Sequence, residues 1–164
     1  MNRKGVSLRD GTEFAEHFYL YREGFTPPVN RAVKAADEER KRVLSRLGMT
    51  VLEPIKVADK EYSPVHSVAS FFGEGSLETG QQMEGPLDLH DRYVTEDVPY
   101  GLKPVSLLGD LLGIAIPVID SIITIASVIS GTDYFAEGYT LEELGLDRLT
   151  PEQITQYLET GATN

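Results

Sequence analysis

One apolar block constrains the fold of this chain more than any other feature. Residues 105–129 are mostly apolar, but Asp110, Gly113, Pro117 and Asp120 interrupt them. A helix that crosses a bilayer needs about 20 consecutive apolar residues, so we do not expect this block to span a membrane. Because proline favours the first turn of a helix and glycine its end, the block predicts two helices, over residues 104–113 and 118–130. The second is apolar on nearly all sides, which is typical of a buried helix.

A long amphipathic helix is predicted earlier in the chain. Thr26 and Pro27 form a typical helix start, apolar residues recur at helical spacing, and Gly48 ends the pattern. The charged run 37–42 is expected on the solvent side of this helix. Similar start signals, a serine-proline pair and two capping boxes, predict three shorter helices. They cover residues 64–72, 141–144 and 151–159.

At least five helices and no convincing pair of strands predict an all-α fold. The aromatic-rich residues 14–21 are a candidate for a short extended piece, and the glycine-rich residues 73–86 are the loosest part of the sequence. We therefore expect an extended, aromatic lead-in over residues 1–26. Residues 27–164 are expected to form one helical domain.

The balance of charge excludes one class of function. The chain has 164 residues and a formal net charge of −11, which argues against sequence-independent binding to nucleic acid, since Lys and Arg must neutralise the phosphates. Residues 1–50 are net positive and residues 51–164 are strongly negative. The acidic part is either a solvated surface or a field that attracts a cationic substrate. The chain has no cysteine, which excludes disulfides and cysteine zinc sites.

Neither a nucleotide-binding turn nor a metal centre is expected from the sequence. A dinucleotide site needs a glycine-rich turn between a strand and a helix, where backbone N–H groups meet the pyrophosphate. The nearest candidate, residues 73–78, follows no strand and contains Glu74 and Glu78, which would repel phosphate. The three histidines are spread along the chain, at His17, His66 and His90. A metal site would require them to converge, so the sequence predicts none.

The candidate site is a polar string directly before the two apolar helices. Residues 90–102 contain one arginine, three acidic residues, one threonine and two tyrosines. Polar side chains at this density, beside a strongly apolar pair of helices, favour a lined pocket. The alternative is an ordinary polar loop in which Thr95 or Asp97 caps a helix.

Four motifs follow one another along the chain. They are YREGFTP (residues 21–27), RYVTEDVPYGL (residues 92–102), PVID (residues 117–120) and AEGYTLEELG (residues 136–145). In this order they resemble the helical domain of the octopine/nopaline (opine) dehydrogenase family. The resemblance extends from about Phe14 to Leu158, which is nearly the whole chain.

The resemblance implies a two-domain enzyme that condenses an amino acid with an α-keto acid and reduces the imine with NAD(P)H. This chain would be its C-terminal all-helical domain, with a fold like that of the C-terminal domain of 6-phosphogluconate dehydrogenase. The partner Rossmann domain is absent from the chain, so NAD or NADP is expected to bind mainly there and not to this fragment. Because removing a domain exposes the apolar surface that it covered, we also expect a homo-oligomer. Residues 1–11 lack the apolar stretch of a secretory signal, so we expect a cytoplasmic protein.

The resemblance also implies roles within the polar string. Arg92 matches the arginine that is expected to bind the substrate carboxylate, for which a planar guanidinium is suited. Thr95 and Tyr100 are expected beside it as substrate-binding residues. Asp97 matches a catalytic aspartate that orients a histidine and favours its protonated form. The histidine-proline motif that supplies this histidine in the family is missing here, so no histidine of this chain is given a catalytic role.

Two functions are therefore open. The first is the substrate-binding helical domain of an NAD(P)-dependent opine dehydrogenase, inactive as an isolated fragment. The second is a stand-alone helical interaction or oligomerisation module that keeps the fold without catalysis. The reading frame upstream of Met1 distinguishes them, because a glycine-rich βαβ sequence there supports the first.

Overall fold

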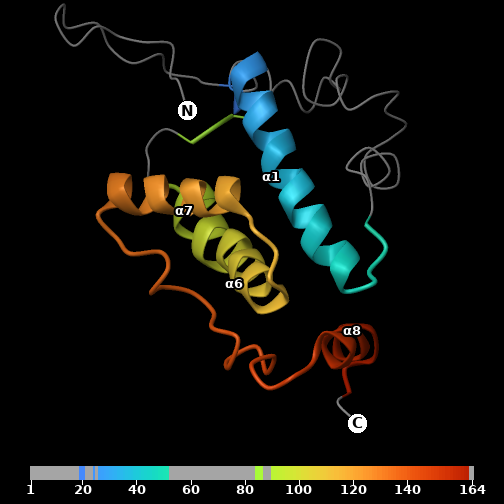
Figure 1. Cartoon of the computed structure of the whole chain (residues 1–164). Coiled ribbons are helices and arrows are strands. Elements are labelled where there is room, and N and C mark those ends of the chain that lie inside the picture. The colour runs from blue at the N-terminus through green and yellow to red at the C-terminus, as the bar shows by residue number, and fades with distance from the viewer. Residues whose placement is uncertain (1–18, 21–23, 25, 52–83, 87–89, 163–164) are drawn as a thin grey trace, which may run out of the picture. The chain divides into compact units, whose positions relative to one another are not determined.

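The computed structural model describes residues 19–20, 24, 26–51, 84–86 and 90–162 (Figure 1). Over these ranges, the strand-like pairing is limited to one isolated antiparallel bridge between Tyr19 and Glu84. The predicted all-α fold is therefore confirmed for the described part of the chain. The expected helix over residues 64–72, and most of the segments 14–21 and 73–86, lie outside the described residues.

The chain divides into two units, Met1–Arg31 with Leu52–Asp88 and Ala32–Val51 with Leu89–Asn164. The second unit contains every element discussed below, apart from the start of the first helix. Among the described residues, no helix combines the length and the apolar character that a membrane crossing requires.

Six helical elements follow one another in the described part. They are α1 (Pro27–Arg46), α5 (Arg92–Thr95), η2 (Asp97–Leu102), α6 (Lys103–Leu112), α7 (Pro117–Ser130) and α8 (Pro151–Thr160). The bounds predicted for α1, α6, α7 and α8 agree with these to within one or two residues. Prolines in the first turns of all four helices explain this agreement, because a proline needs no N–H partner at that position.

The short helix predicted over residues 141–144 is wrong. Its capping box forms, since the backbone N–H of Thr140 donates to Glu143 Oε2 at 2.9 Å and the N–H of Glu143 donates to Thr140 Oγ1 at 3.2 Å. The segment nevertheless makes only hydrogen-bonded turns, which end at Gly145 with a φ of 70°. Of the backbone bonds here, only the one from Leu144 N to Thr140 O has α-helical spacing, since Gly145 N bonds to Glu142 O and Leu146 N to Leu141 O.

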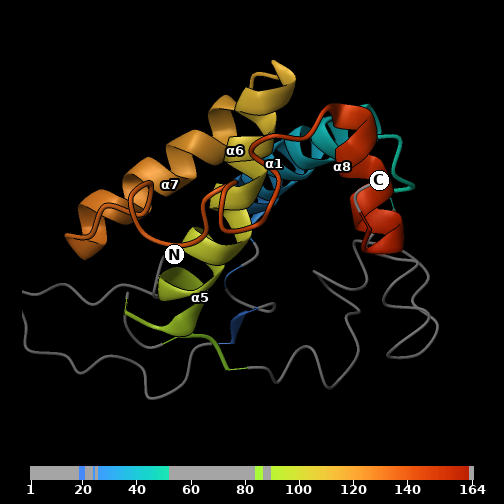
Figure 2. The same cartoon turned by 90° about the horizontal axis from the view of Figure 1, so that it is seen from below.

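Two clusters of buried apolar side chains hold the second unit together. The first joins α1, η2, α7 and the segment after α7, and consists of Val43, Val98, Ile116, Ile119, Ile123 and Tyr134. The second joins the end of α1 to α8, and consists of Leu47, Leu146 and Ile154. Leu108 and Leu112 of α6 pack against both clusters, so α6 connects them. Figure 2 shows α6 beside α7, with α8 at the other end of the unit.

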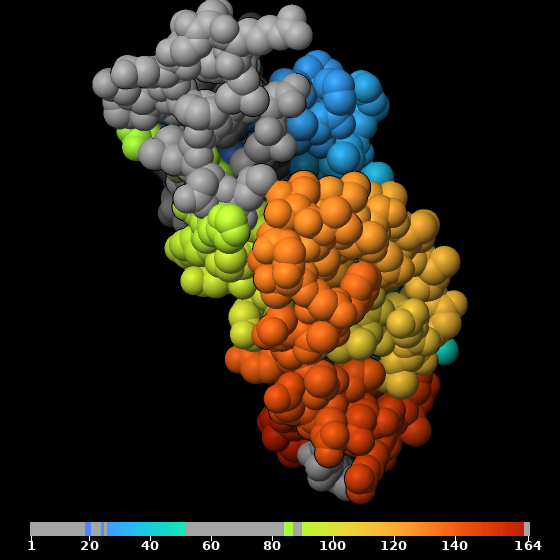
Figure 3. Space-filling view, turned by 90° about the vertical axis from the view of Figure 1, so that its left-hand side faces the viewer, coloured from blue at the N-terminus to red at the C-terminus, as the bar shows by residue number. Residues whose placement is uncertain are grey.

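The expectation that α7 is buried on all sides is wrong. Ile119 and Ile123 are buried, whereas Val128 is 78% exposed, Ile125 59% and Ile129 50%. Figure 3 shows α7, in orange, on the face turned toward the viewer. Among the described elements α6 and η2 pack against α7, and they cover one of its sides. An apolar sequence therefore identified the helix correctly but overstated its burial.

The start of α7 depends on a carboxylate from α1. Its N-cap residue, Ile116, makes no side-chain capping bond, so the first N–H groups of the helix need a partner from elsewhere. Glu39 supplies it: Oε1 accepts from Val118 N at 3.0 Å, and Oε2 accepts from Ile119 N at 2.9 Å. A carboxylate at a helix N-terminus also interacts favourably with the helix dipole.

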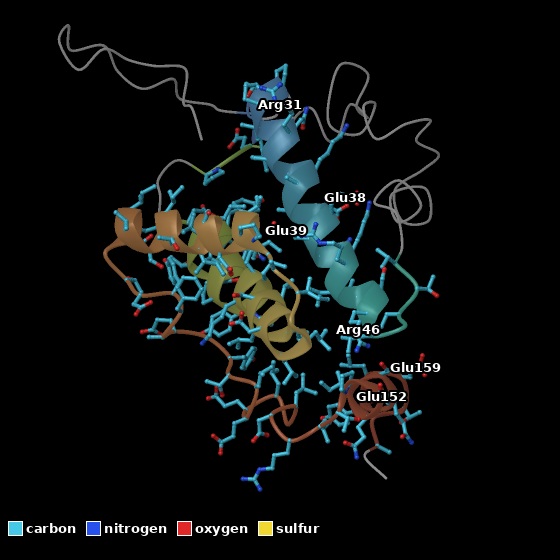
Figure 4. All side chains as sticks on the ribbon, in the orientation of Figure 1. Arg31, Glu38, Glu39, Arg46, Glu152 and Glu159 are labelled. Atoms are coloured by element: carbon cyan, nitrogen blue, oxygen red, sulfur yellow. The ribbon has the colours of Figure 1, made fainter. Side chains whose placement is uncertain are left out.

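This contact places a charged side chain in the interior. Glu39 is only 4% exposed, although the charged run 37–42 was expected on the solvent side of α1. Figure 4 shows Glu39 on the side of α1 that faces α7. Arg42 strengthens the junction, since its Nη2 donates to Ala115 O at 3.0 Å and lies 3.8 Å from Glu39 Oε1. For Glu39 the solvent-side expectation is wrong, because two backbone N–H groups compensate for the loss of hydration.

Helices α6 and α7 are joined by a hydrogen bond and by a close approach. Ser106 Oγ lies 2.7 Å from Asp120 Oδ1, to which it donates. One turn later, Gly109 lies close to the segment between the helices: an added Cβ would lie 3.0 Å from the Cδ1 atom of Ile116 and 3.1 Å from the carbonyl oxygen of Ile114, so these atoms would have to move slightly to admit it. The glycine therefore lets the segment between the helices pack directly on α6.

The segment after α7 folds back onto η2 through a second glycine. Gly138 has a φ of 76°, and an added Cβ would lie 2.2 Å from the carbonyl oxygen of Pro99. Glycine is required there for two reasons, the left-handed backbone and the absence of space. This contact holds the residues after Gly138 against η2.

Replacing Glu39 tests the capping contact. In Glu39→Gln the amide nitrogen faces a backbone N–H, so one donor is left unsatisfied and the charge at the helix start is lost. We expect the free energy of unfolding to fall by about 1–3 kcal/mol, measured by urea denaturation followed by circular dichroism. The control is Glu38→Gln on the same helix, whose side chain is 67% exposed and pairs with Lys41. Its effect should stay below about 0.5 kcal/mol, and equal losses in the two variants would contradict the capping role.

Replacing Gly138 separates backbone strain from lack of space. Gly138→Ala and Gly145→Ala both place alanine at a positive φ, but nothing lies within 4 Å of the Cβ at Gly145. We expect Gly145→Ala to lose about 1–2 kcal/mol from the left-handed backbone alone. Gly138→Ala should lose about 1–3 kcal/mol more, because the methyl group collides with Pro99. The same denaturation measurement decides, and similar losses would show that the close approach is not rigid.

Candidate functional site

The polar string that contains the predicted site residues is helical rather than a loop. Asp91 begins it as the N-cap of α5, where its Oδ1 accepts from Tyr93 N at 3.2 Å. The alternative that Thr95 or Asp97 caps a helix is wrong, since Thr95 Oγ1 instead donates to Asp91 O at 3.3 Å and η2 has no side-chain capping bond. The string therefore lies on a defined backbone, directly ahead of α6.

A π-helix carries the two central residues of the string. In η2 the N–H of Lys103 reaches back to the carbonyl of Val98, which is the wide turn of a π-helix. Val98 and Pro99 are buried, while Asp97 and Tyr100 are exposed. Short π-helices occur frequently at functional sites, because the wider turn changes the direction of the side chains that it carries. Here it turns an aspartate and a tyrosine toward the same space.

That space is a shallow concavity of about 460 Å3 that opens widely to solvent. Its described lining consists of Glu96, Asp97, Tyr100, Gly101 and Tyr139. The rings of Tyr100 and Tyr139 meet edge to face, with centroids 5.2 Å apart and planes at 69°. Edge-to-face contact is a favourable arrangement for aromatic rings and makes one wall of the concavity.

The concavity is negatively charged and aromatic. Two of its described lining residues are carboxylates, and none of them is basic. Among the described residues, no group of histidine, cysteine or carboxylate side chains is suited to hold a metal ion. The surface therefore fits a cationic or hydrogen-bond-donating group, which the carboxylates and the aromatic faces can both attract.

The structure brings together only some of the predicted site residues. Asp97 and Tyr100 share the concavity, whereas Arg92 and Thr95 are not among its lining residues. Arg92 lies at the edge: its side chain is 70% exposed, and its Nε lies 3.5 Å from Oε2 of Glu96. The hydroxyl of Thr95 is bonded within α5. Glu96 thus links the arginine to the concavity.

Tyr139 is the lining residue that sequence reasoning missed. It lies in the motif over residues 136–145, but nothing in the sequence shows that this segment folds back onto η2.

Directly after Tyr139, the backbone N–H and the hydroxyl of Thr140 bond to Glu143 and lower the pKa of that carboxyl. Because the pKa of Glu143 is lowered, the cap stabilises the fold at pH values above the ordinary glutamate pKa. This contribution is lost as the pH falls from that value through the lowered pKa.

The lining of the concavity does not fit a dinucleotide. Binding a pyrophosphate requires backbone N–H groups at a helix start or basic side chains, and this concavity presents carboxylates instead. In the part of the chain that the structure describes, no glycine-rich turn connects a strand to a helix.

Comparison with known proteins identifies the family. Residues 6–130 match the profile of the family described as NAD/NADP octopine/nopaline dehydrogenase, alpha-helical domain. An opine dehydrogenase from Arthrobacter sp. (strain 1C) is 33% identical over 144 residues, which cover 87% of this chain. Vitopine synthase from Allorhizobium ampelinum is 29% identical over 142 residues, and the protein ocs from Agrobacterium tumefaciens (strain Ach5) is 28% identical over 139 residues; each match covers 85% of this chain.

The matches cover only part of each relative. They span 39% of the Arthrobacter enzyme and 38% of each of the other two. Within this chain, the family profile includes α1, the polar string, α6 and α7, and so four of the five described lining residues of the concavity, whereas Tyr139 lies beyond the matched range. This protein therefore belongs to the NAD/NADP octopine/nopaline dehydrogenase alpha-helical domain family.

Proposed function

We propose that this chain is the substrate-binding helical domain of an NAD(P)-dependent opine dehydrogenase, which condenses an amino acid with an α-keto acid and reduces the imine. The observation that carries the proposal is the concavity in which Asp97 of the family motif lies beside Tyr100 and Tyr139. Residues 27–164 form the substrate domain in this proposal, and residues 1–26 lead into it. In this proposal NAD or NADP is held by a separate Rossmann domain, because the carboxylates that line the concavity would repel a pyrophosphate.

Asp97 is the proposed catalytic residue. Its carboxylate is exposed at the lining of the concavity, where a group from another domain can approach it. A carboxylate that accepts a hydrogen bond from an imidazole fixes the tautomer of the ring and favours its protonated form. Asp97 would serve a histidine outside this chain in that way.

Arg92 is the proposed carboxylate-binding residue. Its present contact with Glu96 is a single, exposed ion pair at 3.5 Å, which is worth at most about 1 kcal/mol. A substrate carboxylate can bind the guanidinium with two parallel hydrogen bonds, which are stronger. Thr95 and Tyr100, which flank Asp97 in the sequence, complete the proposed substrate contacts, and the Thr95 hydroxyl can still accept a hydrogen bond while it donates to Asp91 O.

Two substitutions in the enzyme that contains this domain test these roles. Asp97→Asn should lower kcat by about 100-fold or more, because the base loses its charged partner. Arg92→Lys keeps the charge but loses the planar fork, so it should mainly raise the KM for the keto acid, by about tenfold. The control is Asp147→Asn, the same chemical change at a carboxylate that pairs with Arg148. Steady-state kinetics decide, and an Asp97→Asn enzyme with the activity of the control would remove Asp97 from the site.

A second candidate function is supported by the surface of α7. A helical interaction module needs an apolar face, and Ile125, Val128 and Ile129 form one on a single side of this helix. The side chains of residues 121–132 carry no charge, although the chain as a whole is acidic. Homo-oligomerisation through this face is compatible with the enzyme as well as with a module without catalysis.

Light scattering tests the oligomer. We expect the chain to associate at high concentration, and we expect Val128→Glu to convert it to a monomer by placing a charge in the apolar contact. The control is Ala136→Glu, which adds the same charge at an exposed position outside α7. A monomer at all concentrations, or equal behaviour of both variants, would rule out this face as the contact.

A further inference from the structure

Lys103 is a buried cation that contacts backbone rather than an acid. It is only 2% exposed, and its Nζ donates to the carbonyl oxygens of Glu137 at 2.6 Å and Gly138 at 3.2 Å. Within the described residues no carboxylate lies within ion-pair distance of this ammonium, although, after the hydrogen bonds from Thr140, its charge contributes to the lowered pKa of Glu143. Removing a lysine from water is costly, and an ion pair does not offset that cost here. We therefore consider which part of the backbone the two hydrogen bonds of Lys103 hold in place.

What they hold is the segment that carries Tyr139. Lys103 binds the carbonyl groups of the two residues immediately before Tyr139. Gly138 rests at the same time on the backbone of Pro99, with no space between them for a Cβ. The segment is thus attached to η2 at one point and to the first residue of α6 at another. Two attachments on adjoining elements fix its direction as well as its distance.

We propose that Lys103 is a positioning residue, which holds Tyr139 against Tyr100 and thereby sets the shape of the concavity. The aromatic wall depends on these two rings, whose centroids are 5.2 Å apart although they come from different segments. Both tyrosines are about half exposed, so burial alone does not fix the two rings against each other. The bonds from Lys103 supply the missing constraint. That this wall selects the side chain of the substrate rests on the proposed function.

The chemistry of lysine suits this task better than most alternatives. An ammonium on a long stem carries three N–H donors, so one side chain can satisfy two adjacent carbonyl groups. Methionine has a similar stem without donors, and in Lys103→Met both carbonyls would lose their partner. Arginine keeps the charge and presents several donors in a planar fork. Comparing the two variants therefore separates the donors from the packing of the stem.

Nuclear magnetic resonance of the chain reads out the position of Tyr139 directly. The nuclear Overhauser contacts between the rings of Tyr100 and Tyr139 should be present in the unmodified chain and in Lys103→Arg. In Lys103→Met they should be lost, or reduced at least about threefold, while circular dichroism shows the helices intact. The matched control is Ser106→Ala, three residues later on α6 and 5% exposed, which loses the bond to Asp120. It should lower stability and leave the ring contacts unchanged.

Each outcome of the ring-contact measurement either supports or overturns the role of Lys103. Ring contacts that persist in Lys103→Met, or that disappear equally in Ser106→Ala, would overturn the proposal. If Lys103→Met does not fold, Lys103→Gln takes its place: a neutral side chain with a shorter reach should weaken the contacts partially, and full retention would count against Lys103. In the enzyme that contains this domain, Lys103→Met should raise the KM for the amino acid about tenfold with little change in kcat. Failure of the proposed function would appear as no activity in any variant, while the ring contacts still report on Lys103.

Discussion

The carboxylate of Glu39 is the contact on which the rest of the second unit depends. It satisfies the first N–H donors of α7, which has no capping side chain of its own, and it does so from within α1. The first core cluster contains residues of both helices, so the docking of α1 helps to fix the position of α7. α7 in turn supports η2, and η2 carries Asp97. A chain of contacts thus links a buried glutamate to the candidate site.

Two buried ionic groups in this unit serve the backbone instead of each other. Glu39 accepts from N–H groups at a helix start, and Lys103 donates to carbonyl groups in a turn. Both are nearly inaccessible to water, and both compensate for lost hydration with hydrogen bonds to peptide groups. These directional hydrogen bonds fix the orientation of the backbone at two places, which non-directional apolar packing would not do. One place is the start of α7, and the other is the wall of the concavity.

The parts of the fold that local chemistry determines could be predicted from the sequence. Pro117 and Thr150 begin helices, and the capping box at Thr150 forms as expected. The remainder depends on distant partners. Glu39 was placed on the solvent side because its neighbours are charged, yet its partners in α7 lie 79 and 80 residues away. Tyr139 was missed for the same reason, since only the folded chain brings it to η2. Asp97 could be named through its motif, but not the concavity around it.

The long separation between Glu39 and α7 also bears on how the unit reaches its native state. The bond between Ser106 and Asp120 closes a loop of 14 residues, whereas the bond from Glu39 to Val118 closes one of 79. The entropy lost on closing a loop grows with its length, so the short closure is favoured first. Helices α6 and α7 can therefore pair early, but the first turn of α7 has unsatisfied N–H groups until α1 arrives. The order of docking is then the reverse of the order in the sequence: α1, which comes first along the chain, docks last.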